Sequence, residues 1–215
     1  GDGPLIGVGL STVIKMSGGS GESRNEEGWL KIEPDGQITA LTGISPHGQG
    51  SATAFAQIIA DQLGVTPSDV EVLHGDTAVV PSGGGTGATR ATVVGGSALY
   101  LVAEEARHKL VRIAAHMLGC AEADVVLEER EAFSRQDRGK TVAFSELAAA
   151  AYQEEKLPPG VTPGLDFSGS FTLGQPYQSP HSFSTHVVAV QVSRENGVIE
   201  ILDYTAIHDC GRILN

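Results

Sequence analysis

The sequence predicts an α+β fold, in which strands and helices share one chain without strict alternation. Three observations support this class. Alternating runs flank a tight turn near the N-terminal end, two long segments carry apolar residues at helical spacing, and strand-like runs return towards the C-terminal end. The chain has 215 residues, of which 40% are hydrophobic, so a sizeable core can be buried. We therefore expect mixed sheets with packed helices.

The first part of the chain is expected to hold a buried strand, a loop and a hairpin. Leu5–Ile14 is apolar with small residues, which is typical of a buried strand, whereas Lys15–Glu27 is polar and predicts a loop. Two alternating runs, Trp29–Glu33 and Gln37–Thr42, flank Pro34-Asp35-Gly36. Because proline presets φ and glycine accepts positive φ, this arrangement predicts a hairpin.

A pattern of helix, glycine, turn and strand then occurs twice. Ser51–Leu63 and Ser97–Leu118 carry apolar residues at helical spacing, and a glycine that can end a helix follows each of them, Gly64 and Gly119. After a short turn comes a strand-like run in both cases, Val70–Leu73 and Val125–Leu127. We interpret these segments as two copies of one helix–strand unit.

The remainder predicts one further helix and three strands. The helix is Ser145–Gln153, capped by its first serine, and the Pro/Gly-rich connector Leu157–Gly164 follows it. The connector suggests two sub-units, 1–156 and 165–215. The expected strands are Leu165–Thr172, Thr185–Ser193 and Val198–Ile207, the last two joined by the turn Glu195-Asn196-Gly197.

Charge and composition exclude several function classes. The formal net charge of -12 argues against nucleic acid or an anionic membrane as a partner. No apolar run approaches the length of a membrane span, and two cysteines cannot build a disulfide framework. The histidines show no metal-ligand spacing. We therefore expect a cytoplasmic protein with no metal ligands of its own.

Glycine is abundant, at 28 residues, and clusters before the two long helices. The first cluster, Ser45–Gly50, leads directly into a helix, where free backbone N–H groups and the helix dipole favour an anion. Gln49 adds an amide that can donate and accept. The other interpretation is an ordinary helix-entry turn.

The second cluster, Pro81–Gly96, combines glycines with hydroxyl groups from Thr86, Thr89 and Thr92 and with the guanidinium of Arg90. Such a loop can cradle a phosphate, although a mobile surface loop would have the same composition. A third segment, Ile207–Asn215, places a carboxylate, a thiol and a guanidinium after an apolar strand. It could contact a ligand or be a solvated turn.

At these segments the chain resembles the molybdenum hydroxylases, the family of xanthine dehydrogenase, aldehyde oxidase and the aerobic carbon monoxide dehydrogenases. It is most similar to the carbon-monoxide-dehydrogenase-type large subunit. The resemblance rests on five blocks in order, which are Thr42-Gly43…His47-Gly48-Gln49-Gly50, Ala56-Gln57-Ile58…Asp61-Gln62-Leu63-Gly64-Val65, His74-Gly75-Asp76-Thr77, Gly85-Thr86-Gly87…Arg90 and Asp209-Cys210-Gly211-Arg212…Asn215.

The resemblance implies that residues 1–215 are a fragment of a molybdopterin-binding domain. Its cofactor would be molybdenum held by a pterin dithiolene, extended to a cytosine dinucleotide. The resemblance also implies partners: the remainder of the molybdenum subunit, and iron–sulfur and FAD subunits or domains in an oligomer. The family's catalytic glutamate lies downstream of the Asp-Cys-Gly-Arg segment, so this chain is expected to contain no catalytic residue.

The resemblance also assigns cofactor contacts to particular residues. His47, Gly48, Gln49 and Gly50 would lie near the pterin, with Gln49 near the molybdenum. The phosphates and nucleotide would be held by a second group, Thr86, Gly87, Thr89, Arg90 and Thr92. The nucleotide tail would contact Asp209, Cys210 and Gly211.

The expected function is therefore a part of the cofactor-binding subunit of an oxidoreductase. Such an enzyme hydroxylates a carbon centre of an aldehyde, an N-heterocycle or CO with water as the oxygen source, and the fragment alone is expected to be inactive. Two alternatives remain open: a non-catalytic scaffold or subunit-contact module that has lost the metal site, and a simple nucleotide-binding domain that uses the loop Ser82–Gly96.

Overall fold

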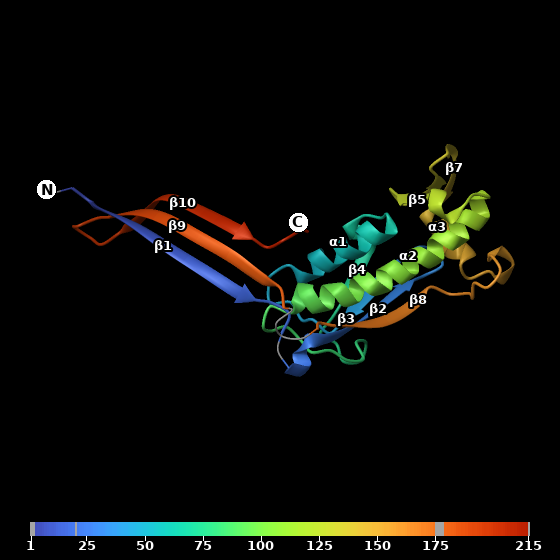
Figure 1. Ribbon diagram of the computed structural model, residues 1–215, viewed down its shortest axis with the longest axis horizontal. Helices are drawn as coiled ribbons and strands as arrows, with labels where there is room; N and C mark the ends of the chain where they lie inside the picture. Colours follow the sequence, from blue (N-terminus) through green and yellow to red (C-terminus); the bar gives the residue numbers. More distant parts are fainter. Residues whose placement is uncertain (1–2, 20, 175–178, 215) are drawn as a thin grey trace. The chain divides into compact units, whose positions relative to one another are not determined.

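The computed structural model describes residues 3–19, 21–174 and 179–214, which form two compact units (Figure 1). Of the described residues, the larger unit contains 18–19, 21–174 and 214, and the smaller contains 3–17 and 179–213. The described residues form three sheets together with helices, which confirms the predicted α+β class. No helix in this part of the chain is long and apolar enough to cross a membrane.

A four-stranded sheet forms the centre of the larger unit. Its strands are β2 (Asn25–Ile32), β3 (Ile38–Thr42), β4 (Val70–Leu73) and β8 (Asp166–Thr172), in the order β4-β3-β2-β8. The predicted hairpin is confirmed, because β2 and β3 pair antiparallel and Gly36 turns between them at φ 87°. Alternate residues of β2 are buried, so one face of the sheet lies on the core.

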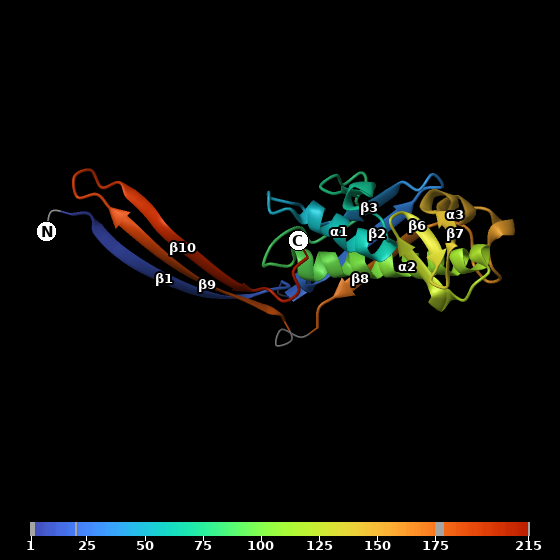
Figure 2. The ribbon, with the colours of Figure 1, turned by 90° about the horizontal axis from the view of Figure 1, so that it is seen from above.

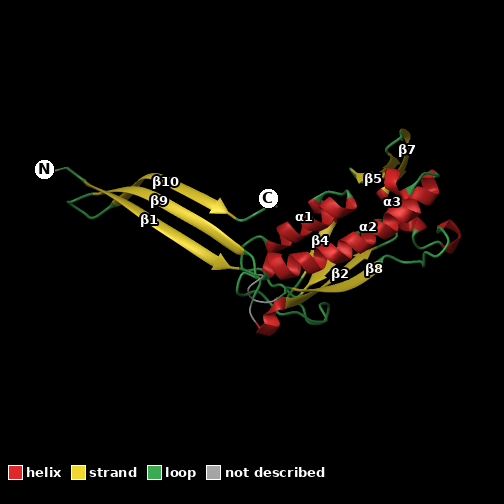
Figure 3. Cartoon of the chain, viewed as in Figure 1, coloured by secondary structure: helices red, strands yellow, loops and turns green. Residues whose placement is uncertain are grey.

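Two helices cover that buried face (Figure 2, Figure 3). They are α1 (Ser51–Leu63) and α2 (Ser97–Leu118), with the bounds that the apolar spacing predicted. Glycines in the strands let α2 approach closely. A Cβ added at Gly28 would lie 3.1 Å from Leu99, and one added at Gly169 would lie 3.1 Å from Val102.

The repeated helix–strand unit is confirmed. Each helix ends at a glycine in the left-handed region, followed by a short 3-10 turn, η2 (Pro67–Asp69) or η4 (Glu122–Asp124), and then by a strand. The two copies differ in the sheet that they join. β4 pairs in parallel with β3, whereas β5 (Val125–Glu128) belongs to a separate sheet of the order β5-β6-β7.

That separate sheet is not among the sequence predictions. Its further strands are β6 (Glu131–Ser134) and β7 (Asp137–Ala143), and helix α3 (Phe144–Ala150) follows. The prediction that Ser145 caps this helix is wrong. The helix begins one residue earlier, and Ala143 is the N-cap, its N–H donating to Glu146 Oε2 at 3.2 Å.

The smaller unit is a three-stranded antiparallel sheet, which we call the ribbon. It consists of β1 (Leu5–Met16), β9 (His181–Val192) and β10 (Ile199–Asp209), with β9 in the middle. The predicted connection of the last two strands is confirmed, with Gly197 at φ 72° in the turn. The prediction that Leu5–Ile14 is buried is wrong, because every residue of β1 is exposed and neither face of the ribbon is covered within its unit.

Two boundaries differ from the sequence predictions. The segment Lys15–Glu27 is only partly a loop, because Met16 ends β1 and Asn25 begins β2. Residues 157–164 lie inside the larger unit, since β8, which follows them, pairs with β2. The compact units therefore divide at other points than 157–164.

Candidate functional site

The candidate site lies where two parallel strands end. β3, α1 and β4 form a β–α–β crossover, so β3 and β4 end at the same edge of the sheet. Residues 43–50 lead from β3 into α1. Residues 74–90 lead from β4 into η3 (Ala91–Gly96), a π-helical turn that continues into α2. Loops at the carboxyl ends of parallel strands commonly bind ligands, and both predicted glycine clusters lie here.

The structure brings these two loops into contact. Thr86 Oγ1 donates to the backbone oxygen of Ser45 at 2.6 Å. The backbones of Gly43 and Gly83 are so close that a Cβ added at either would lie 2.2 Å from the Cα of the other. Between the loops lies a cavity of about 400 Å³, lined by Gly43, Ser45, Gly75, Asp76, Thr77, Val80, Pro81, Ser82, Gly83 and Gly85.

The glycines of this region fall into two groups. Packing glycines have no room for a side chain: a Cβ would lie 2.5 Å from Ile44 at Gly95 and 2.8 Å from the Arg90 guanidinium at Gly84. Open glycines have nothing within 4 Å of an added Cβ, and these are Gly48, Gly50, Gly75, Gly85 and Gly87. Because no side chain shields them, their backbone N–H groups can be approached by a ligand.

Arg90 is buried, with 1% of its surface exposed, and it anchors the second loop. Its Nη1 donates to Glu26 Oε2 at 2.7 Å, and its Nε donates to the oxygen of Ser23 at 2.7 Å. Further bonds run from the guanidinium to the carbonyl oxygens of Asn25 and Gly85. The same Glu26 oxygen accepts the N–H of Gly84 at 3.2 Å.

These contacts give Arg90 a role that the sequence did not suggest. Its guanidinium bonds with protein oxygen atoms, so in this arrangement it holds the loop to β2. Sequence reasoning missed Glu26, which is also 1% exposed, because it stands in a run of charged residues. The signal that could have found it is the period of two along β2: Glu26, Gly28, Leu30 and Ile32 all face inwards.

The backbone of the second loop is strained just before Arg90. Ala88 and Thr89 have positive φ angles, 43° and 55°, which side chains rarely adopt. Their carbonyl oxygens accept the N–H groups of Gly19 and Gly18, each at 3.1 Å. Residues held in this way cluster at binding sites, where the surrounding structure supports the strain.

The other predicted site residues have the following places. His47 and Gln49 are exposed on the first loop, where the His47 N–H donates to Gln49 Oε1. Thr92 is exposed on η3. Asp209, Cys210 and Gly211 belong to the smaller unit, so their position beside the two loops stays a prediction. Asn215, which closes the last block, lies outside the described residues.

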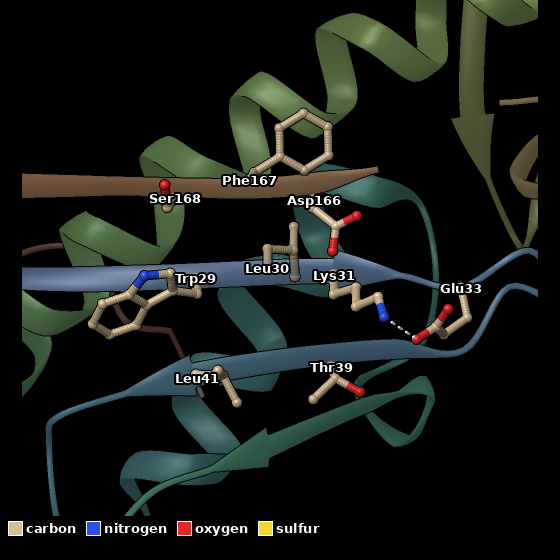
Figure 4. A pocket seen from close by; sticks show the side chains of 9 residues that line it. All are labelled: Trp29, Leu30, Lys31, Glu33, Thr39, Leu41, Asp166, Phe167 and Ser168. Carbon is tan, nitrogen blue, oxygen red and sulfur yellow. Dashed lines mark ion pairs between the residues drawn. The ribbon is translucent and has the colours of Figure 1, made fainter. Parts of the chain in front are cut away.

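A second cavity, of about 510 Å³, opens on the face of the central sheet that the helices do not cover (Figure 4). Trp29 and Leu41 give it an apolar floor, and Lys31 pairs with Glu33 at 2.6 Å at its edge. The hydrogen bond from Lys31 to Glu33 and the charge of Glu33 raise the pKa of Lys31. None of the predicted site residues lines this cavity, and it has no glycine-rich backbone.

Across the described ranges, no group of three or more His, Cys, Asp or Glu side chains could hold a metal ion. The candidate site instead offers open backbone N–H groups and hydroxyl groups at the carboxyl edge of a β–α–β unit. That arrangement is suited to an anionic, phosphate-bearing ligand, and it is the kind of site found in proteins that bind such ligands. The chain matches the family of molybdopterin cofactor-binding domains over residues 2–215, and it therefore belongs to that family.

Individual proteins that are similar to this chain support the family assignment. The chain is 30% identical to the nicotine 6-hydroxylase large subunit of Paenarthrobacter nicotinovorans over 99% of its own length, and 31% identical to the carbon monoxide dehydrogenase large chain of Hydrogenophaga pseudoflava over 98%. It spans 27% of each of these relatives. The solved quinoline 2-oxidoreductase of Pseudomonas putida 86 matches with a TM-score of 0.84 at 27% identity, covering 99% of this chain and 28% of that one.

Proposed function

We propose that this chain is a part of the molybdenum-cofactor-binding subunit of an oxidoreductase that hydroxylates a carbon centre with water as the oxygen source. The family match and the named relatives support this activity. The observation that carries it is the contact of the two glycine loops, with open glycines on both of them. Open glycines suit a ligand with phosphate groups, because they let the phosphates approach backbone N–H groups closely.

The residues of this chain would hold and orient the cofactor. The N–H groups of Gly48 and Gly50 would receive the pterin end, with the Gln49 amide towards the molybdenum. Gly85 and Gly87 would receive the phosphates, and the hydroxyl groups of Thr89 and Thr92 would lie beside them. When bound, the molybdenum supplies the redox chemistry of the hydroxylation, and no residue of this chain reacts with the substrate.

We assign to Arg90 and Glu26 the role of holding the second loop in place, and not that of contacting a phosphate directly. Arg90 bonds with protein oxygens, and Glu26 holds both Arg90 and the N–H of Gly84. The finer parts of the proposal are a cytosine dinucleotide extension near Asp209, Cys210 and Gly211, and iron–sulfur and FAD partners in the cytoplasm. Both rest on the resemblance to the carbon-monoxide-dehydrogenase-type large subunit, and the printed names of the relatives, a large subunit and a large chain, fit a protein that assembles with further subunits.

The test places a larger side chain at an open glycine, where it is expected to leave the fold intact. Gly87 has an ordinary backbone angle and nothing within 4 Å of an added Cβ, so Gly87→Val is expected to fold normally and to obstruct the cofactor. In the full-length polypeptide, we expect it to lower bound molybdenum and released cytidine nucleotide by about tenfold. Elemental analysis and nucleotide analysis of the purified protein measure both quantities.

The matched control is Gly139→Val, on the exposed strand β7 of the separate sheet, which is expected to keep the molybdenum content of the wild type. If the purified wild-type full-length protein folds but contains no molybdenum, that result would contradict the proposal and favour the non-catalytic scaffold. The 215-residue chain alone is expected to hold little or no molybdenum and to show no hydroxylase activity. Tight binding of a mononucleotide to that chain, measured by titration, would favour the simple nucleotide-binding domain.

A further inference from the structure

The turn that leads into η3 has a backbone conformation that its own residues do not favour. The oxygen of Gly87 accepts the N–H of Arg90 at 3.0 Å, which closes the turn. Both central residues, Ala88 and Thr89, have positive φ angles. Turns of this kind favour Asn-Gly or Gly-Gly at the central positions, because a Cβ makes the left-handed conformation costly. The conformation of this turn must therefore be held by contacts from elsewhere.

Two glycines from the segment between β1 and β2 supply those contacts. As noted above, the N–H groups of Gly18 and Gly19 donate to the oxygens of Thr89 and Ala88. Both glycines have positive φ angles themselves, 99° and 80°. An added Cβ at Gly19 would lie 2.6 Å from the backbone oxygen of Ser23. The backbone here can approach the turn only because neither position carries a side chain.

Arg24 ties these glycines to the central sheet. It is 7% exposed, and its Nη1 donates to the oxygen of Gly19 at 3.2 Å. Its Nε donates at 2.9 Å to the oxygen of Gly174, just after β8, and its Nη2 donates to the same oxygen. The neighbouring Ser23 offers its oxygen to Nε of Arg90. We call the following four residues the strap: Gly18, Gly19, Ser23 and Arg24.

The route from Arg24 to the turn runs through Gly19. The guanidinium holds the Gly19 oxygen, and the Gly19 N–H holds the Ala88 oxygen. Because glycine has the greatest backbone freedom, Gly19 would lose its alignment with the turn if its oxygen were released. A guanidinium suits this position, since its rigid fork of donors can serve the oxygens of Gly19 and Gly174 together. The strap and the turn both belong to the larger unit.

The turn held in this way faces solvent with the groups that a phosphate would contact. The side chains of Ala88 and Thr89 are exposed, and Gly87 has nothing within 4 Å of an added Cβ. If the strap let go, Ala88 and Thr89 would gain free energy by leaving the left-handed region, because side chains are strained there. The Thr89 hydroxyl and the backbone beside it would then point in other directions.

We propose that Arg24 is a positioning residue of the cofactor site, which acts through Gly19 to keep the turn Gly87–Arg90 in its left-handed conformation. In that conformation the turn presents Gly87 and Thr89 to a phosphate group. The inference rests on the proposed function and deepens it. It also separates two supports of the second loop, because Arg90 with Glu26 holds the loop to β2, whereas Arg24 sets the conformation of the turn.

The experiment compares Arg24→Gln with the double variant Arg24→Gln/Ala88→Gly in the full-length polypeptide. Arg24→Gln removes the fork of donors, and we expect it to lower bound molybdenum about tenfold, the factor that one strained residue can contribute. Ala88→Gly removes only an exposed methyl group and adopts a positive φ without strain. The double variant is therefore expected to return to within about twofold of the wild-type molybdenum content, measured by elemental analysis.

A second measurement reports on the turn itself and needs no cofactor. The Arg90 N–H closes the turn, so its hydrogen exchange, followed by mass spectrometry, shows how often the turn opens. In full-length protein from cells grown without molybdate, we expect Arg24→Gln to speed this exchange about tenfold. Ala88→Gly should return it to the wild-type rate, because the turn then holds its conformation without the strap.

Two further variants serve as control and as safeguard. Arg107→Gln makes the same chemical change at an arginine whose Nη1 donates to the oxygen of Gln62 at 2.8 Å, near the end of α1 that lies away from the glycine loops. It is expected to keep the wild-type molybdenum content and the wild-type exchange at Arg90. Arg24→Lys keeps the buried charge and replaces Arg24→Gln if that variant fails to fold. We expect it to lose about threefold in molybdenum, with the same recovery by Ala88→Gly.

The two measurements separate this inference from the proposed function. Unchanged exchange at Arg90 in the Arg24 variants, or a loss of molybdenum that Ala88→Gly does not reverse, would overturn the inference and leave the proposed function standing. If wild-type full-length protein folds without molybdenum, the proposed function fails, and hydrogen exchange still decides whether Arg24 sets the conformation of the turn.

Discussion

At the scale of single residues, glycine has two roles in this chain that composition cannot separate. Gly43, Gly83 and Gly84 are needed because neighbouring atoms occupy the place of a side chain. Gly48, Gly85 and Gly87 leave that place empty. The first group brings the two loops together, and the second presents backbone to a ligand. The same residue type therefore builds the site and keeps it accessible.

Alanine substitutions distinguish the two groups. In Gly83→Ala the new methyl group would lie 2.2 Å from the Cα of Gly43, so the loop must move, and we expect a loss of about 1–3 kcal/mol in the free energy of unfolding. Gly87→Ala, in the same loop, meets nothing and is expected to change the stability by less than about 0.5 kcal/mol. Urea unfolding followed by the fluorescence of Trp29, the single tryptophan, measures both. Similar losses in the two variants would contradict this division.

The Glu26–Arg90 pair is the second residue-scale feature, and its burial decides its importance. Both side chains are 1% exposed, so a change at one leaves the other charge buried without its partner. We expect Glu26→Gln to lower the free energy of unfolding by about 3 kcal/mol. It should also release the loop to proteolysis, because the bond to the Gly84 N–H is weakened.

The exposed ion pair Lys31–Glu33 provides the control for that prediction. It lies at the end of the same strand, with 51% and 38% of the two side chains exposed. Water already solvates both charges, so Glu33→Gln should leave the unfolding curve nearly unchanged. If Glu26→Gln were equally harmless, the buried pair would not be what holds the loop.

At the scale of elements, the repeated helix–strand unit shows how one local pattern serves two environments. Gly64 ends α1 and Gly119 ends α2, both in the left-handed region. Gly64 also packs against β5, since an added Cβ would lie 2.3 Å from the carbonyl of Leu127, whereas Gly119 has open space. Helix α1 therefore ends against the separate sheet, and the Gly64 oxygen accepts the Arg130 N–H at 2.9 Å.

The same junction contains a charged contact. Arg130, in the turn between β5 and β6, pairs with Asp69 of η2. Desolvation pulls the pKa of Asp69 upwards, but the hydrogen bonds from Thr66 and the charge and hydrogen bond of Arg130 outweigh it, so this pKa lies below its ordinary value. The first helix–strand unit is thus tied to the second one.

The two helix ends offer a matched comparison. Gly119→Ala should cost about 1 kcal/mol, because a side chain must adopt the left-handed conformation without any collision. Gly64→Ala has the same backbone cost and adds a collision with β5, so we expect it to cost about 1–3 kcal/mol more. Thermal or urea unfolding of both variants measures the difference. Equal losses of unfolding free energy in the two variants would mean that β5 moves aside for the new methyl group at no cost in free energy.

At the scale of the whole molecule, the two units differ in how far they bury their apolar residues. The larger unit buries a continuous core beneath α1 and α2. The ribbon has formed its backbone hydrogen bonds, but the residues of β1 and β10 are exposed and most of those of β9 are half-buried. Because hydrophobic burial dominates folding free energy, most of the burial that stabilises the described chain comes from the larger unit.

Much of the fold follows from local pattern. The helices Ser51–Leu63 and Ser97–Leu118, the hairpin around Gly36 and the glycine helix ends are all predictable, because each depends on residues close in sequence. Strands β6 and β7 were missed, since their charged and polar residues hide the alternation. That the two glycine clusters are neighbours was not predicted, because it depends on the parallel pairing of β3 with β4, a contact between residues distant in sequence.

By itself, then, the sequence determined the fold class, the main elements, the family and the two segments that form the candidate site. Only the tertiary structure decided which glycines are open, that Arg90 is paired with Glu26 rather than free for a phosphate, and that the ribbon is exposed on both faces. The physical reason is one of distance along the chain. Local periodicity reports the conformation of neighbouring residues, whereas burial and pairing depend on contacts between residues such as Glu26 and Arg90, which are 64 positions apart.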